Sequence, residues 1–154
     1  MRLLEDEVTL SKELHDFTEK HKKNLGLVSL DVPLISNLNV WVNIALIKQY
    51  HENLSADRAQ ELVRSYLTRY SLEGISNKRN PTLTNRERFC AMLLRAVMVR
   101  DSIVIIDRPF TIIPDVQDDR FIYDALKAVD DSFKECHIFD YLWFKDKYRV
   151  IDVQ

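Results

Sequence analysis

Two residues of opposite charge, Asp107 and Arg108, directly follow an uninterrupted apolar run, Ile103-Val104-Ile105-Ile106. A carboxylate at the end of a buried strand could hold a metal ion, or it could pair with a neighbouring cation. Arg108 carries a guanidinium that stays protonated, so it cannot take up a proton as a general base does. We therefore expect Asp107 and Arg108 to form salt bridges, and metal binding by Asp107 is the open alternative.

A second polar group of residues stands just before a long apolar segment: Leu83, Thr84, Asn85, Arg86 and Glu87. Thr84 followed three residues later by Glu87 is typical of a capping box, in which each side chain accepts a hydrogen bond from the other residue's backbone N–H. The pattern predicts that a helix begins at this point.

The composition argues against several classes of function. The net charge of −2 gives no electrostatic basis for binding nucleic acid. No apolar run reaches the roughly 18 residues of a membrane-spanning helix, and the first residues do not form a signal-peptide pattern. The four histidines share no ligand-like spacing, so we expect no metal site. Cys90 and Cys136 are expected to be buried free thiols, which is typical of a cytosolic protein.

The chain has only two glycines, Gly26 and Gly74, and neither precedes Lys-Ser or Lys-Thr. The phosphate-binding pattern G-x-x-x-x-G-K-[ST] is therefore absent from these residues. Without that loop there is no backbone cradle and no lysine for the β- and γ-phosphates of a nucleotide.

Hydrophobic periodicity predicts the elements that position these residues. In the first half we expect a strand over 26–30 that ends before Pro33, a helix over 40–51 capped by Asn39, and a helix that begins at Ser55. The segment 3–22 could be one helix or a strand followed by a helix. In the second half we expect, in order, a polar loop at 74–81, a helix over 89–99, a buried strand over 102–107, a helix over 116–133 capped by Asp115, and strands at 137–141 and 148–153.

These motifs, in this order, resemble the second half of an ABC-transporter ATPase. LTNRE stands where that family has the signature LSGGQ, and SIVIIDRP stands where it has a strand of the type LLLDEP. Residues 26–46 resemble the family segment G-x-V-F-Q that continues to T-V-x-x-N-V-A. With ALIKQYH at 45–51, the match is closest to ATPases of lipid and organic-solvent (Mla-like) transporters.

The resemblance implies that several functional positions have changed. Leu30 stands at the family's magnesium-contacting glutamine, and Asn85 and Arg86 replace the signature glycines, although Arg86 could still meet a phosphate. Asp107 matches the Walker B aspartate, and Arg108 replaces the catalytic glutamate that follows it.

Other family positions are displaced. The D-loop aligns with 111–114, so its aspartate is lost unless Asp115 substitutes after a shift of one residue. The switch histidine aligns with Asp140 or Tyr141, because His137 comes too early in its strand. The strand and helix that flank the phosphate loop cannot fit into the 25 residues before Gly26.

The element order predicts an α/β fold: a partial P-loop NTPase core with a mostly parallel sheet, plus an α-helical lobe, without the N-terminal half that holds the phosphate loop. We expect a single domain over 1–154, with the lobe at 38–82 and the core at 1–37 and 83–154. Missing strands would leave 102–107 at an open edge, which the helix within 3–22 or a partner would cover.

These inferences predict a non-catalytic protein, not an enzyme, that binds other proteins as an accessory or regulatory component of an ABC transporter of the lipid type. No cofactor is expected, and ATP with magnesium would bind only if a partner supplied a phosphate loop. Two alternatives stay open: a nucleotide-binding ABC ATPase fragment that is active only with a partner chain, or an unrelated α/β regulatory domain.

The expected partners are a transporter permease, an intact ATPase subunit or a second copy of the chain. The resemblance implies that a coupling helix of the permease docks on the segment that contains Leu34, Ile35, Ser36, Asn37 and Trp41. Trp143 and Phe144 are a second candidate, because exposed aromatic residues can anchor an interface. The chain is expected in the cytoplasm, reaching the inner membrane only through its partner, and the transported substrate stays open.

Overall fold

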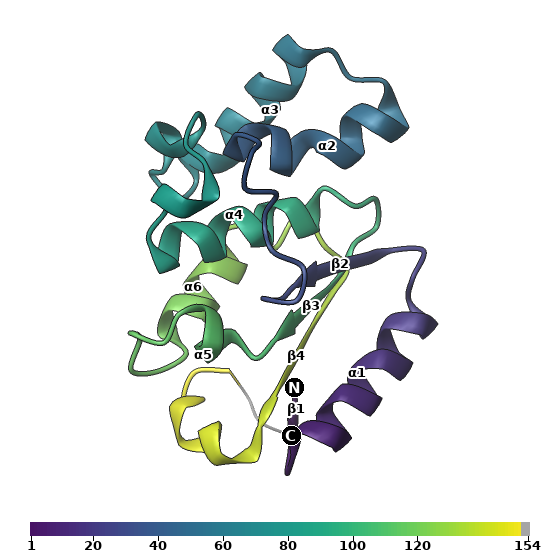
Figure 1. Ribbon diagram of the computed structural model, residues 1–154, viewed down its shortest axis with the longest axis vertical. Helices are drawn as coiled ribbons and strands as arrows, with labels where there is room; N and C mark the ends of the chain where they lie inside the picture. Colours follow the sequence, from purple (N-terminus) through teal and green to yellow (C-terminus); the bar gives the residue numbers. More distant parts are fainter. Residues whose placement is uncertain (152–154) are drawn as a thin grey trace.

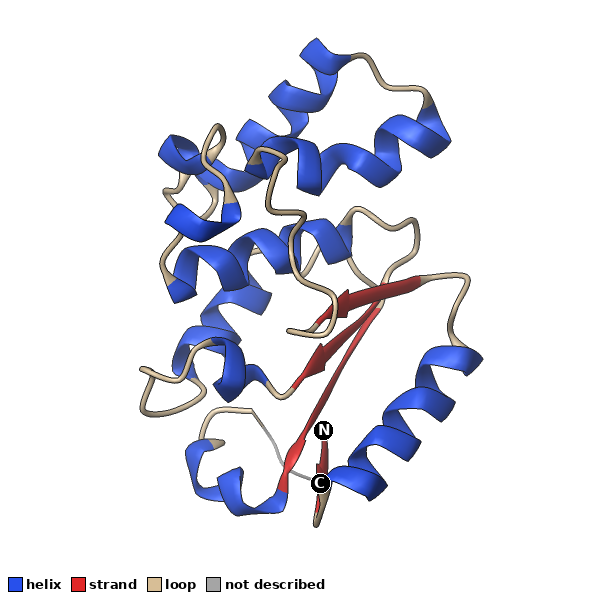
Figure 2. Cartoon of the chain, viewed as in Figure 1, coloured by secondary structure: helices blue, strands red, loops and turns tan. Residues whose placement is uncertain are grey.

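The computed structural model describes residues 1–151, and its centre is a sheet of four parallel strands in the order β1-β4-β3-β2. Figures 1 and 2 show the sheet between helix α1 on one face and the remaining long helices on the other. The strands are β1 (Arg2–Leu4), β2 (Leu25–Val28), β3 (Ile103–Asp107) and β4 (Glu135–Tyr141).

Six α-helices and three short 3-10 helices connect the strands within the described residues. The α-helices are α1 (Glu7–Lys20), α2 (Val40–Glu52), α3 (Ala56–Thr68), α4 (Asn85–Val97), α5 (Pro109–Ile112) and α6 (Arg120–Lys127). The 3-10 helices are η1 (Glu73–Ile75), η2 (Asn80–Thr82) and η3 (Leu142–Lys147). The predicted helices at 40–51 and from Ser55 are confirmed as α2 and α3. Asn39 stands at the N-cap of α2 but its side chain makes no capping hydrogen bond, whereas Ser55 accepts one from the backbone N–H of Arg58 at the start of α3.

The N-terminal segment is a strand followed by a helix. Strand β1 pairs with β4, and only two residues, Glu5 and Asp6, lead from it into α1. Asp6 caps the helix by accepting a hydrogen bond of 2.7 Å from the backbone N–H of Thr9. A strand and a helix thus precede Gly26, but their two-residue connection cannot hold G-x-x-x-x-G-K-[ST], so the prediction that the elements flanking a phosphate loop do not fit there stays a prediction.

Strand β3 lies inside the sheet, with β4 on one side and β2 on the other. The prediction that it would lie at an open edge is wrong, because β4 and β2 pair with its two sides. The edges of the described sheet are β1 and β2. The unbroken apolar sequence of β3 is explained by this central place, since both of its faces are covered.

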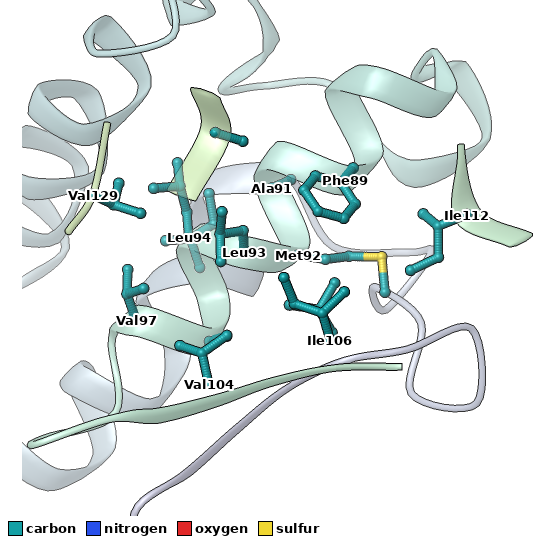
Figure 3. Close-up of a cluster of buried hydrophobic side chains, with 14 of the residues drawn as sticks. Phe89, Ala91, Met92, Leu93, Leu94, Val97, Val104, Ile106, Ile112 and Val129 are labelled. Carbon is teal, nitrogen blue, oxygen red and sulfur yellow. The ribbon is translucent and has the colours of Figure 1, made fainter. Parts of the chain in front are cut away.

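The two faces of β3 pack against different helices. Val104 and Ile106 belong to the large buried cluster with α4, which Figure 3 shows together with Phe89 and Leu93. Ile105 points the other way and forms a smaller cluster with Phe17 of α1 and Phe139 of β4. The alternation follows from the two-residue period of a strand.

The predicted helix over 116–133 is wrong in both of its bounds. Helix α6 covers only 120–127, and Asp115 does not cap it. Asp119 is fully buried, and its carboxylate accepts hydrogen bonds from the backbone N–H groups of 149–151. These hydrogen bonds to a distant segment fix the chain just before α6. A tight turn that follows Ala128 ends the helix.

The predicted strand at 148–153 is not formed over 148–151, and its last two residues lie outside the described part of the chain. Helix α2 packs on α4 on the side away from the sheet, and α3 packs on α2 (Figure 1). The division into a lobe at 38–82 and a core stays a prediction. No helix among residues 1–151 is long and apolar enough to cross a membrane.

Candidate functional site

The carboxyl ends of the four parallel strands lie at one edge of the sheet, which is where open α/β sheets bind their ligands. We call this region the carboxyl edge and define it by Ser29 after β2, Asp107 and Arg108 at the end of β3, and Asp140 and Tyr141 at the end of β4. The fold thus gathers polar residues from three strands at one place.

Asp107 is 1% exposed, and both of its carboxylate oxygens accept hydrogen bonds. Arg108 donates from Nε to Oδ1 over 2.8 Å and from Nη2 to Oδ2 over 3.1 Å. Ser29 donates from Oγ to Oδ2 over 2.7 Å. The predicted pairing of Asp107 with Arg108 is therefore present, whereas Ser29 was missed because nothing in the local sequence links β2 to β3.

Arg108 holds an unusual backbone conformation. Its φ of 49° and ψ of 63° are left-handed, which costs free energy for a residue with a β-carbon. The backbone N–H of Arg108 donates to the carbonyl of Phe139 over 2.7 Å, and Nη2 also reaches Asp31 over 3.3 Å. The hydrogen bond to Asp107 raises the pKa of Arg108 above its usual range, and the neighbouring Tyr141 adds to this effect. A strained backbone conformation of this kind persists only where the surrounding contacts hold it, and such positions are common at functional sites.

The LTNRE segment forms the predicted capping box at the start of α4. The backbone N–H of Thr84 donates to Glu87 over 2.9 Å, and the backbone N–H of Glu87 donates to the Thr84 hydroxyl over 3.2 Å. The sequence did not point to Arg88, whose guanidinium stabilises this turn. It donates hydrogen bonds to Asn85, to Asn80 and to the carbonyl of Leu83.

Arg86 lies at the same end of the molecule as the carboxyl edge. The carbonyl of Ala96, near the end of α4, lies close to Gly26 at the start of β2, so α4 runs antiparallel to β2 and its N-terminus points toward the carboxyl edge. Arg86 is half-exposed, lies 3.7 Å from Asp115 and stacks over Phe121. Asp115, which would replace the D-loop aspartate after a shift of one residue, thus contacts Arg86 of the LTNRE segment and not Asp107.

The segment predicted to bind a partner has one buried and several exposed side chains. Leu34 is 2% exposed and belongs to the core, whereas Ile35 is 44% exposed, and Ser36 and Asn37 are also exposed. Trp41 is half-buried at the start of α2. Of the apolar residues in this set, Ile35 offers the most surface to a partner.

Two polar side chains, the buried Asn43 and the half-buried Arg95, hold this segment in shape. Asn43 makes four hydrogen bonds of 2.7 to 3.2 Å to backbone groups of residues 35, 38 and 39. Arg95 of α4 donates to the backbone carbonyls of Val32 and Pro33. Burial lowers the pKa of Arg95 from its usual value.

A pocket of about 620 Å³ lies between this segment, β2, α2 and α4. We call it the apolar groove, because most of its lining is hydrophobic: Leu25, Leu27, Val32, Ile35, Leu46, Ile47, Tyr50 and Val99, together with Gly26, Asn43, Arg95 and Ala96. Several of these apolar side chains are also well exposed, and Tyr50 reaches 84%. Exposed apolar surface of this kind is common where proteins bind a partner.

The remaining candidate residues make contacts that are typical of residues that stabilise the fold. Asp140 is fully buried and accepts a hydrogen bond of 2.5 Å from the hydroxyl of Tyr148. His137 packs against Phe17 of α1 and lies 3.2 Å from Glu135. Burial raises the pKa of the Cys90 and Cys136 thiols to about 12, so both stay protonated at neutral pH. Among residues 1–151, no cluster of histidine, cysteine or carboxylate side chains could hold a metal ion.

Magnesium, which ABC-type ATPases use with ATP, does not fit on the carboxylate of Asp107 while Arg108 and Ser29 occupy its oxygens. The two oxygens already receive three hydrogen bonds, and an ion would have to displace the guanidinium of Arg108. Arginine side chains such as that of Arg108 are well suited to bind phosphate oxygens.

Comparison with known proteins identifies similar sequences, although no protein-family model matches the chain. It is 31% identical over 110 residues to a sulfate/thiosulfate import ATP-binding protein (CysA) of Bacillus cereus, and 29% identical over 89 residues to a protein of the same name from Synechocystis. These matches cover 68% and 58% of this chain but only 31% and 25% of the relatives' lengths.

Solved structures agree in fold. The bacterial ABC transporter cassette MJ0796, described as dimeric, aligns with a TM-score of 0.60 at 17% identity over 82% of this chain and 56% of the cassette chain. Its form with ADP and phosphate bound aligns with a TM-score of 0.56 at 15% identity. The prediction of an α/β fold that forms part of such a cassette is confirmed.

These comparisons overturn one prediction. The similar proteins are named ATP-binding proteins and belong to an enzymatic class, so the prediction that the chain is no enzyme, with motifs that have lost their chemistry, is wrong. These relatives are named for sulfate and thiosulfate import, so a lipid-type transporter stays a prediction. In both sequence and fold, this chain is similar to part of an ABC transporter ATP-binding cassette.

Proposed function

We propose that the chain is the nucleotide-handling segment of an ABC-type ATPase and that the phosphate loop of the complete site comes from outside these 154 residues. The observation that carries the proposal is the 31% identity to a protein named as an ATP-binding subunit. The arginine at the carboxyl edge, Arg108, also supports the proposal, because a guanidinium is well suited to phosphate oxygens. A second copy of the same residues would also lack G-x-x-x-x-G-K-[ST], so the loop would come from residues beyond this sequence or from an intact ATPase subunit as partner.

The arginine at the end of β3 would be the main phosphate ligand in this arrangement. Asp107, which accepts a hydrogen bond from Ser29, holds the guanidinium of Arg108 in place at the carboxyl edge and raises its pKa. Arg86, at the N-terminus of α4, supplies a second cation toward the same end of the molecule. Both residues bind and orient phosphate oxygens. The group that activates water for hydrolysis would come with the partner, because a guanidinium cannot accept a proton.

Calorimetric titration of the full chain with ATP tests this proposal. Without a phosphate loop we expect weak binding, with a Kd of about 1 mM, which corresponds to roughly −4 kcal/mol. Arg108→Ala should weaken binding about tenfold or more, because hydrogen bonds to charged groups contribute roughly 1.5–3 kcal/mol. Arg64→Ala, an exposed arginine on α3, is the matched control and should leave the Kd unchanged. A folded wild-type chain that takes up no ATP would contradict the proposal.

The apolar groove supports a second role, docking on the membrane subunit of the transporter. Its hydrophobic lining and its length along α2 fit one face of an amphipathic helix, which binds such grooves through side chains spaced at helical intervals. The predicted partner segment forms one wall of the groove, and Ile35 contributes an exposed side chain. The chain would then meet the membrane only through that subunit.

Recovery of the membrane subunit from native membranes tests the docking role. Ile35→Asp places a charge in the groove without altering the core and should abolish recovery of a subunit with several membrane spans, identified by mass spectrometry. Val8→Asp changes a side chain that is 80% exposed on α1 and serves as the matched control. Equal recovery by the Ile35→Asp variant, or no such subunit with the wild type, would refute docking through the groove.

A further inference from the structure

The apolar groove contains one charged side chain. Among the residues that line it within 1–151, only Arg95 carries a charge. Arg95 comes from α4, and the loop that joins β2 to α2, drawn in dark blue in Figure 1, passes over this helix. The guanidinium donates hydrogen bonds to two carbonyls of that loop, those of Val32 and Pro33. These contacts hold a cation in a fixed place on the wall of a hydrophobic groove.

This cation has no anionic partner within the described residues. No carboxylate among residues 1–151 forms a salt bridge with Arg95. Burial lowers its pKa, and no neighbouring anion opposes that change. A helix that covered the groove would remove more water from the guanidinium. Because a buried charge without a partner is costly, an occupant that brings a carboxylate is favoured over one that does not.

The guanidinium can still receive a ligand. Its Nη1 and Nη2 atoms donate to the two loop carbonyls, whereas Nε donates to no acceptor within residues 1–151. Nε is not sealed from solvent, since no buried side-chain nitrogen in the described part of the chain lacks a hydrogen-bond partner. The N–H groups that remain free are suited to a carboxylate, which accepts charge-assisted hydrogen bonds from a guanidinium.

One end of the groove adds to the positive charge. A polar pocket of about 380 Å³ adjoins it there, because Ile47 and Val99 line both. The charged residues of this pocket are Lys23, Lys48, Arg100, Glu52 and Asp101, together with the titratable His51. Both carboxylates already contact a lysine: Glu52 lies 3.0 Å from Lys48, and Asp101 lies 3.7 Å from Lys134. Electrostatic complementarity therefore favours an acidic occupant over a basic one.

We infer that the helix that docks in the apolar groove carries an acidic residue on its apolar face, and that the carboxylate of this residue pairs with Arg95. This inference rests on the proposed docking role and adds the chemistry of the partner. Arg95 is then a specificity-determining residue. It selects against a wholly apolar helix, which would leave the guanidinium buried and unpaired, and against a basic one, which it repels.

Selection from a peptide library tests the inference without knowledge of the partner. The displayed peptides are alanine-rich and about 16 residues long, so that they can form a helix, and the residues of one face are varied. They are selected on the immobilised full chain, and peptides that Ile35→Asp also retains are discarded, so the remaining peptides use the groove. We expect Asp or Glu within the apolar face of most of them. Selection on Arg95→Gln should remove this preference.

Calorimetry on one selected peptide isolates the ion pair. Its acidic residue is replaced by the matching amide, and this change should weaken binding to the wild type about tenfold. Arg95→Gln should bind the acidic and amide peptides with equal affinity. If Arg95 served only to hold Val32 and Pro33, Arg95→Gln would weaken both peptides by the same factor, and the preference for the acidic peptide would persist. Arg64→Gln, an exposed position on α3, is the matched control and should keep the preference.

The possible failures are distinguishable. If the selected peptides have no acidic residue on the apolar face, or if the amide peptide binds as tightly, this inference fails while the docking role stands. If Arg95→Gln still prefers the acidic peptide tenfold, the carboxylate pairs with another cation and the inference also fails. If the wild type, shown by circular dichroism to be folded, retains no peptide that depends on the groove, both the inference and the docking role fail.

Discussion

Buried carboxylates determine the chemistry of this molecule at the scale of single residues. Asp107, Asp119 and Asp140 are each at most 1% exposed, and each is satisfied by different donors: a guanidinium and a hydroxyl, backbone N–H groups, and a tyrosine hydroxyl with a backbone N–H. A buried charge without such donors would cost several kcal/mol, so these contacts are needed for folding as well as for any binding.

Asp140 makes the stability of the fold depend on pH. Burial raises its pKa above the reference value of 3.8, and the hydrogen bond from Tyr148 partly opposes that rise. The folded protein therefore holds this proton more tightly than the unfolded chain. The stabilisation is complete below the unfolded pKa and is lost as the pH rises through the folded pKa.

Tyr148→Phe removes the opposing hydrogen bond, so the pKa of Asp140 should rise further. We expect the free energy of unfolding, measured with urea from about pH 4 to about pH 7, to fall more steeply with rising pH in this variant than in the wild type. Tyr50→Phe, on an exposed side chain, is the control. Parallel pH curves for Tyr148→Phe and the wild type would mean that the Tyr148 hydroxyl does not affect the titration of Asp140.

At the scale of elements, the contact between β2 and α4 depends on one glycine. A β-carbon on Gly26 would lie 2.3 Å from the backbone carbonyl oxygen of Ala96 and 2.7 Å from the Ser102 hydroxyl, and the first contact cannot be relieved without moving the backbone. A β-carbon on Gly74 would meet nothing within 4 Å. The two glycines of the chain therefore have different roles.

Gly26→Ala should separate α4 from the sheet. We expect a loss of about 1–3 kcal/mol or more in thermal or urea unfolding, which is typical of overpacking against rigid atoms. Gly74→Ala should change stability by less than about 1 kcal/mol, and a small gain is expected from the reduced entropy of the unfolded chain. Equal stability of the two variants would show that α4 can shift away from β2 without loss.

The elements that sequence reasoning predicted correctly are those whose signals are local. The apolar run of β3 and the capping box of Thr84 and Glu87 are each specified within a few residues, and both are confirmed. Helix α6 was predicted too long, because its start depends on hydrogen bonds between Asp119 and residues 149–151. Ser29 was missed for the same reason, since its partner Asp107 is 78 residues away along the chain.

At the scale of the whole molecule, the helices above the sheet share one core with it. Val40 and Ile44 of α2 and Leu67 of α3 belong to the same buried cluster as Val104 and Ile106 of β3. Polar contacts add a second connection: the hydroxyl of Tyr66 bonds to Ser132, and that of Tyr70 to the carbonyl of Ala125. The ion pair between Arg69 and Asp131 is exposed and contributes little. We propose that residues 1–154 fold as a single domain.

Cooperative unfolding tests this proposal, because the two tryptophans lie at opposite ends of the molecule. Trp41 is at the start of α2, and Trp143 is in the yellow segment after β4 (Figure 1). Trp41→Phe and Trp143→Phe each leave one fluorophore. Since the core is continuous, we expect the urea midpoint and slope from each tryptophan to agree with those from circular dichroism of the same variant, as a two-state transition requires. A Trp41 signal that changed at lower urea than circular dichroism would show that the helices at 38–82 unfold as a separate unit.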